Sequence, residues 1–111
     1  MEKRRVVITG MGAITPLGKT AEDSWTAAKA GVCGIDTITL YDSSSMKVHL
    51  AGEVKDFNPE DYMPRREARR MDRFTQFAMV AADEAMKQSG LDLENEDTNR
   101  IGVILSSGIG G

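Results

Sequence analysis

Residues 6–18 read VVITGMGAITPLG. The first four residues of this stretch are all β-branched and are followed by glycine, which predicts a short buried strand over residues 6–9. Gly10, Gly12 and Pro16 then indicate a turn. A strand followed by glycines is also how a phosphate-binding loop begins, so the stretch raises the question of a nucleotide site.

The spacing of these residues argues against a nucleotide site. A dinucleotide-binding loop has the pattern G-x-G-x-x-G and leads directly into a helix whose amide groups hold the pyrophosphate. Gly10 and Gly12 fit this pattern, but Thr15 stands at the third glycine position and Pro16 follows it. The next helix start is Thr20, which is too late for that role. A nucleotide-dependent oxidoreductase is therefore the least favoured function, and no cofactor is expected.

Two helices are predicted downstream of this turn. Thr20 can cap a helix over about residues 21–30, because Asp23 lies three residues further on and glycines follow the helix. A longer helix ends at Gly90, with Lys87 in its last turn. Its inward face is predicted from apolar residues that recur at steps of three and four: Met71, Phe74, Ala78, Ala81 and Ala85, widened by Phe77 and Ala82.

The overall layout predicts an α/β protein with the element order β-α-β-α-β. Residues 101–105 are a second candidate for a buried strand, and residues 49–54 are a weaker one because Gly52 interrupts them. The first and last strands are expected to pair in parallel. Two helices are too few to cover both faces of a parallel sheet, and the glycine-rich SSGIGG follows the last strand directly. Residues 1–111 are therefore expected to be an incomplete part of a larger fold.

Composition excludes several classes of site. The formal net charge is −3, so the chain as a whole does not attract nucleic acid or acidic membranes. One cysteine, Cys33, allows no internal disulfide and favours a reducing, cytoplasmic compartment. Cys33 also follows a helix, where the negative dipole end disfavours a reactive thiolate. With His49 as the one histidine, no metal site is expected. No apolar stretch reaches the roughly 18 residues that a membrane helix needs.

The most unusual stretch is PRREARRMDR, residues 64–73. If it lies on one helix, its arginines stand four residues apart and form a continuous basic ridge, although like charges at this spacing repel. The ridge indicates either an anionic partner or a solvated face that Glu67 and Asp72 partly neutralise. An acidic protein fits better than nucleic acid, because the chain is acidic and the stretch lacks interleaved aromatic residues. The arginines are Arg65, Arg66, Arg69, Arg70 and Arg73.

Five stretches occur in order along the chain: RRVVITGMGAITPLG, AGVCGI, AGEVKDFNPEDYM, RREARRMDRFTQFAMVAADEAMKQSGL and RIGVILSSGIGG. Together they resemble the N-terminal segment of the β-ketoacyl-[acyl-carrier-protein] synthases, in particular the type II branch of this family of condensing enzymes. The resemblance runs through all 111 residues. It implies the N-terminal part of a thiolase-like layered fold, in which the opening stretch is the first strand and turn.

The resemblance implies an acyltransferase of fatty acid biosynthesis. In this family an acyl group moves from acyl carrier protein to a cysteine, and a carbanion from malonyl carrier protein attacks it with loss of carbon dioxide. The cysteine and two histidines that carry this chemistry lie later in a longer chain, and neither Cys33 nor His49 matches them. Residues 1–111 are therefore expected to be inactive alone. A homodimer without a cofactor is implied for the longer protein.

The resemblance also assigns two sites on this chain. The basic surface that contacts the acidic carrier protein falls on Arg66, Arg69 and Arg70. Ile109 corresponds to the isoleucine that gates the growing acyl chain beside the acyl pocket, and glycines on each side give the backbone freedom to move there. The alternative is a free-standing binding module that uses its arginine-rich helix to hold an acidic protein or nucleic acid.

Overall fold

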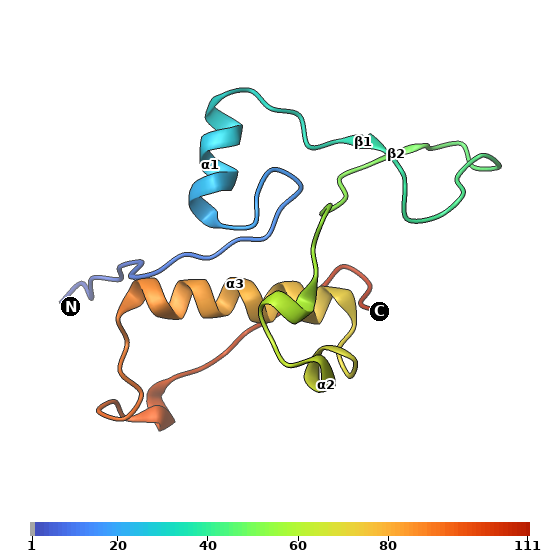
Figure 1. Cartoon of the computed structure of the whole chain (residues 1–111). Coiled ribbons are helices and arrows are strands. Elements are labelled where there is room, and N and C mark those ends of the chain that lie inside the picture. The colour runs from blue at the N-terminus through green and yellow to red at the C-terminus, as the bar shows by residue number, and fades with distance from the viewer. Residues whose placement is uncertain (1) are drawn as a thin grey trace.

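The N-terminal segment, α3 and the C-terminal segment lie along one another in the computed structural model, which describes residues 2–111 (Figure 1). The helices are α1 (Ala21–Lys29), α2 (Arg65–Ala68) and α3 (Arg73–Ser89), with the short 3-10 helices η1 (Pro59–Asp61) and η2 (Thr98–Arg100). The strands are β1 (Asp36–Thr37) and β2 (Leu50–Ala51).

Helix α1 confirms the prediction for residues 21–30. The Thr20 hydroxyl accepts a hydrogen bond from the Asp23 amide at 3.0 Å, which caps the first turn. Glu22 and Asp23 stand at the positive end of the helix dipole, and Lys29 stands in the last turn. Gly31, with φ of 73°, then turns the chain away from the helix.

The predicted strands at residues 6–9 and 101–105 do not form. Within residues 2–111 the one sheet is antiparallel, pairing Asp36 with Ala51 and Thr37 with Leu50. The weak strand expected over 49–54 is thus limited to Leu50–Ala51, in an arm that projects from the rest of the chain (Figure 1). A short β-branched run becomes a strand only when another strand satisfies its backbone, and neither segment has such a neighbour.

The two unpaired segments nevertheless run in the same direction along α3. Gly10 lies against Ala85 and Gly12 against Ala81, while at the other end of the chain Gly110 lies against Phe74. Both segments therefore run antiparallel to α3, and hence parallel to each other (Figure 1). Gly12 and residues 105–107 line a common cavity of about 330 Å³ over the middle of α3.

The glycines of the opening stretch permit close packing. A Cβ atom at Gly10 would overlap the carbonyl oxygen of Ala85, and one at Gly12 would overlap that of Ala81. The intervening Met11 amide donates to Gln88 Oε1 on the same helix. The face that a phosphate-binding loop would offer to a nucleotide is therefore in contact with α3.

Glu84 joins three parts of the chain. Its carboxylate accepts from the Ala13 amide at 2.9 Å and from the Ala21 amide at 2.9 Å, so α3 holds both the N-terminal segment and the first turn of α1. Ala21 is the first residue of α1, and its amide has no partner inside that helix. A carboxylate beside this helix end satisfies the amide and the helix dipole together.

The chain leaves an unusually large surface uncovered. Its accessible area is 9445 Å², against about 6,000 Å² for a compact protein of this mass. Its radius of gyration is 17.3 Å, against about 13 Å for a compact chain of this length. Phe57, Ala68 and Val80 are the buried apolar residues within the described part, and Val6 and Ile104 are 92% and 99% exposed. The observed fold is therefore incomplete as a layered structure.

Candidate functional site

The arginine-rich stretch begins with two short helices. Asn58 caps η1 by accepting from the Glu60 amide at 3.2 Å. Pro64 then opens α2, and its carbonyl accepts from the amides of Glu67 and Ala68 at 2.9 and 3.0 Å. Ala68 is 4% exposed, so the single turn of α2 is anchored on its inner side and carries its arginines outward.

The predicted continuous ridge of arginines on one helix is wrong. Helix α2 ends at Ala68 and α3 begins at Arg73, so a turn separates them. Asp72, at the N-cap of α3, has extended backbone angles of −67° and 158°. Because Asp favours this position, the sequence can start a new helix here despite the helical spacing of the arginines. Arg69 and Arg70 consequently lie in the turn.

Two of the five arginines have internal partners. Arg65 Nε lies 3.3 Å from a carboxylate oxygen of Glu60. Arg73 donates from Nη2 to the Val54 carbonyl at 2.7 Å. Its guanidinium also lies 5.5 Å from the ring centre of Phe57 and 5.0 Å from that of Phe77. Arg73 therefore ties the segment before η1 to the start of α3.

Arg66, Arg69 and Arg70 form what we call the arginine surface. All three side chains are exposed, and none has a hydrogen bond or ion pair within residues 2–111. Glu67 and Asp72, which the sequence suggested as neutralising charges, make no ion pair with them in the described chain. The structure thus brings together, on α2 and the turn after it, three positive charges that have no internal partner.

The glycine-rich loop lies next to the same turn. Gly110, with φ of 95°, donates its amide to Ser107 Oγ at 3.0 Å. A Cβ atom on Gly110 would contact the Phe74 ring at 3.8 Å, and Gly111 lies against Asp72. The C-terminal loop therefore lies near the N-terminal end of α3 (Figure 1). The side chain of Ile109 in this loop is fully exposed. Both sequence-predicted sites lie at the same end of α3.

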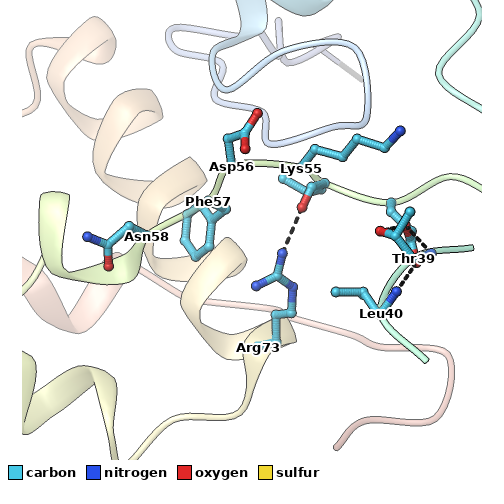
Figure 2. Close-up of a pocket in the computed structure, with 9 residues that line it drawn as sticks. Thr39, Leu40, Lys55, Asp56, Phe57, Asn58 and Arg73 are labelled. Atoms are coloured by element: carbon cyan, nitrogen blue, oxygen red, sulfur yellow. Dashed lines mark hydrogen bonds between the residues drawn. The ribbon is translucent and has the colours of Figure 1, made fainter. Parts of the chain in front are cut away.

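A cavity of about 580 Å³ opens beside Arg73, lined by Thr39, Leu40 and residues 53–58 (Figure 2). Its polar groups are largely satisfied within the chain. Glu53 accepts from the Thr39 hydroxyl at 2.8 Å, which lowers the pKa of Glu53. Figure 2 shows Arg73 directed at the backbone of the opposite wall. These contacts fix the base of the β1–β2 arm, and they leave few donors for a ligand.

The lone cysteine and histidine are not brought together with other chemistry-bearing groups. Cys33 is exposed after α1, with its thiol 3.6 Å from the Ile35 carbonyl oxygen. Residues 2–111 contain no cluster of three or more His, Cys, Asp or Glu side chains arranged to hold a metal ion. Among the same residues, no helix has the length and apolar character to cross a membrane.

Sequence reasoning missed the polar residues of α3 that hold other segments. Gln76 Nε2 donates to the carbonyls of Ala68 and Met71 at 3.0 and 3.3 Å. Glu84 interrupts the predicted inward face between Ala81 and Ala85, and a charged residue there is the one signal that could have pointed to its role in holding other segments. No pattern in the sequence marks Gln76 in a comparable way.

Comparison with known proteins places the chain in a family. The family "Beta-ketoacyl synthase, N-terminal domain" matches residues 3–111. The chain is 54% identical over 110 residues to 3-oxoacyl-[acyl-carrier-protein] synthase 2 of Staphylococcus aureus strain N315, covering 99% of this chain and 27% of that protein. It is 47% identical over 111 residues to the synthase of the same name in Vibrio cholerae, again covering 27% of the relative.

Solved structures of ketosynthases agree with this family assignment. The ishigamide ketosynthase/chain length factor superposes with a TM-score of 0.71 at 33% identity, over 85% of this chain and 23% of that one. A type II polyketide ketosynthase, solved as AntDE in complex with its acyl-carrier protein AntF, gives a TM-score of 0.63 at 30% identity, over 88% and 24%. The chain thus spans about a quarter of the length of these relatives, and it belongs to the β-ketoacyl synthases, as part of their N-terminal domain.

Proposed function

We propose that this chain is the N-terminal part of a 3-oxoacyl-[acyl-carrier-protein] synthase and that its share of the reaction is to dock the acyl carrier protein. The observation that carries the proposal is the arginine surface, where Arg66, Arg69 and Arg70 are exposed without internal partners. A relative solved in complex with its acyl-carrier protein supports the choice of partner. Exposed charges of this kind steer the encounter and fix its orientation.

The condensation itself belongs to groups outside this chain. A cysteine takes the acyl group as its thioester bond to the carrier protein breaks. Malonyl carrier protein then loses carbon dioxide, and the resulting carbanion attacks the cysteine thioester and expels the thiolate. Two histidines support these steps, and no cofactor takes part. The whole enzyme is a cytoplasmic homodimer in this proposal, with the layered β-α-β-α-β fold completed by the remaining sequence.

Ile109 is proposed to gate the acyl pocket. Its side chain is fully exposed, and the loop that carries it lies beside Asp72 and Phe74, next to the turn that holds Arg69 and Arg70. A carrier protein docked on the arginine surface would therefore deliver its acyl group to the end of α3 where Ile109 lies. Glycines on both sides allow the loop to change conformation without the strain that a side chain would impose.

The test is a titration of the chain with fluorescently labelled acyl carrier protein and, separately, with duplex DNA, each at low and high salt. The expected result is binding to the carrier protein that weakens with salt, because salt screens exposed charges. Stronger binding to DNA with a steep salt dependence would favour the alternative, a free-standing basic binding module. In a condensation assay with acyl and malonyl carrier protein, the chain alone should form no β-ketoacyl product.

A further inference from the structure

We infer that Gln76 is a positioning residue for the arginine surface: its side-chain amide bridges the two carbonyls that bracket Arg69 and Arg70 and so holds both arginines in place. The role in binding rests on the proposed docking function. The two hydrogen bonds of the Gln76 side chain, which we call the clamp, can be tested without any partner. Gln76 lies in the first turns of α3, on a different helix from α2.

The geometry of the clamp is direct. Gln76 Nε2 lies 3.0 Å from the Ala68 carbonyl oxygen and 3.3 Å from that of Met71. Arg69 and Arg70 are the two residues between these anchor points. Both partners are carbonyl oxygens, which only accept, so the donating end of the amide must face them. One side chain thus fixes both ends of the turn.

The turn has few other restraints. Helix α2 has 4 residues, far fewer than the roughly 12 that an isolated helix needs to be even marginally stable in water. The backbone bonds of the turn are local: the amides of Arg69, Arg70 and Met71 donate at 3.1, 3.0 and 3.2 Å to the carbonyls of residues 65, 67 and 68. The neighbouring like charges oppose an ordered arrangement. The hydrogen bonds from Gln76 therefore add a restraint from α3 to the local backbone bonds and to the buried Ala68 before a partner arrives.

Preorganisation of this kind strengthens binding because the partner does not have to order the loop itself. Without the clamp the same three charges would remain, but they would be spread over many conformations. Removing Gln76 should therefore weaken docking without changing the charge of the surface. Such a result would show that Gln76 acts by positioning the arginines, because Gln76 itself is not expected to contact the carrier protein.

The first test uses trypsin, which cleaves after arginine. Gln76→Met keeps the length and helix propensity of the side chain but removes the donors. Cleavage after Arg69 and Arg70 should become about fivefold faster for each hydrogen bond lost, since proteolysis follows local opening. Cleavage after Arg5, in the N-terminal segment, serves as an internal reference and should not change. Gln88→Met, on the same helix and bound to Met11, is the matched control and should leave cleavage after Arg69 and Arg70 unchanged.

The second test measures carrier-protein affinity in a double-mutant cycle. Gln76→Met should raise the Kd about fivefold in the unmodified chain. It should have almost no effect when Arg69 and Arg70 are already alanine, because nothing is left for it to position. A loss of general structure would weaken binding in both backgrounds, since Arg66 remains. Circular dichroism should show equal helix content in the Gln76 and Gln88 variants.

The outcomes separate the inference from the proposed function. Unchanged cleavage after Arg69 and Arg70 in Gln76→Met would overturn the clamp. Faster cleavage with unchanged affinity, while the arginine substitutions do weaken binding, would overturn the positioning role. If the arginine substitutions themselves leave carrier-protein affinity unchanged, the docking function fails, and the trypsin result still decides whether Gln76 holds the turn.

Discussion

Replacing the three residues of the arginine surface with alanine should weaken carrier-protein binding, and an equal loss of charge elsewhere should not. The test variant is Arg66→Ala/Arg69→Ala/Arg70→Ala. The control replaces the basic residues 3–5, Lys-Arg-Arg, with alanine and removes the same number of positive charges. Residues 3–5 lie toward the opposite end of α3 from the C-terminal loop (Figure 1).

The size of the effect follows from exposure and distance. An exposed ion pair contributes about 0.5 kcal/mol, so losing three costs about 1.5 kcal/mol, or roughly a tenfold rise in Kd at about 0.1 M salt. Helix α3 has 17 residues and is therefore about 25 Å long. Charges at its far end lie well beyond the Debye length of about 10 Å at 0.1 M salt, so the control should change Kd less than about twofold.

Fluorescence anisotropy of labelled carrier protein measures both variants under the same conditions. The difference between them should shrink as salt is added, because the pairs are exposed. Equal losses of affinity in the two variants would mean that only total charge matters. Full affinity in the arginine-surface variant would refute the assignment of these residues as the docking site.

Three further predictions concern the packing of the N-terminal segment on α3 and the base of the β1–β2 arm. Glu84→Gln should lower the protection of the N-terminal segment's amides in hydrogen exchange about tenfold, because a donor replaces one accepting oxygen, whereas Asp83→Asn should change it less than about twofold. Gly12→Ala should cost at least about 2 kcal/mol in urea unfolding followed by tryptophan fluorescence, because its Cβ would overlap the backbone of α3. Gly102→Ala, with no atom within 4 Å of the new Cβ, should unfold at the same urea concentration as the unmodified chain. The pKa of Glu53 is lowered from 4.5 by its hydrogen bonds in the folded chain. Its contribution to the β1–β2 arm should therefore be complete above that pH and be lost as the pH falls through the lower folded pKa, which an NMR titration of the arm amides would follow.

Local signals predicted the helices well. Helix α1 begins where Thr20 places its cap, because capping depends only on residues a few positions apart. The sequence also predicted the end of α3 at Gly90, which has a φ of 64°. The predicted inward face of the long helix was right only in part, because its other members are half-buried but Ala82 is exposed, and the buried residue of α3 is Val80, which was not predicted. The apolar period also did not reveal that Asp72 starts a new helix. The apolar repeat of a sequence can continue across a turn when the residues before and after the turn pack on the same side.

The strands could not be predicted in the same way. Residues 6–9 and 101–105 have the composition of buried strands, yet strand formation depends on a partner that is distant in sequence. Arg66, Arg69 and Arg70 are exposed, as a local cluster of charge in the sequence indicates, and their role in docking stays a prediction. What holds them in place was not predicted, since Gln76 acts through backbone carbonyls that carry no side-chain signature. Tertiary hydrogen bonds to backbone are the part of this site that sequence reasoning does not reach.

The two extended segments that flank α3 also determine how the chain behaves at high concentration. Val6, Ile8, Val103 and Ile104 are 81–99% exposed, and the backbone beside them forms no sheet hydrogen bonds within the described residues. Unpaired, apolar, β-branched segments are templates for pairing with another copy. A net charge of −3 gives little electrostatic repulsion against such contacts. We therefore expect the chain to self-associate through these two segments when it is concentrated, and charged substitutions at Ile8 or Ile104 should suppress this without altering the arginine surface.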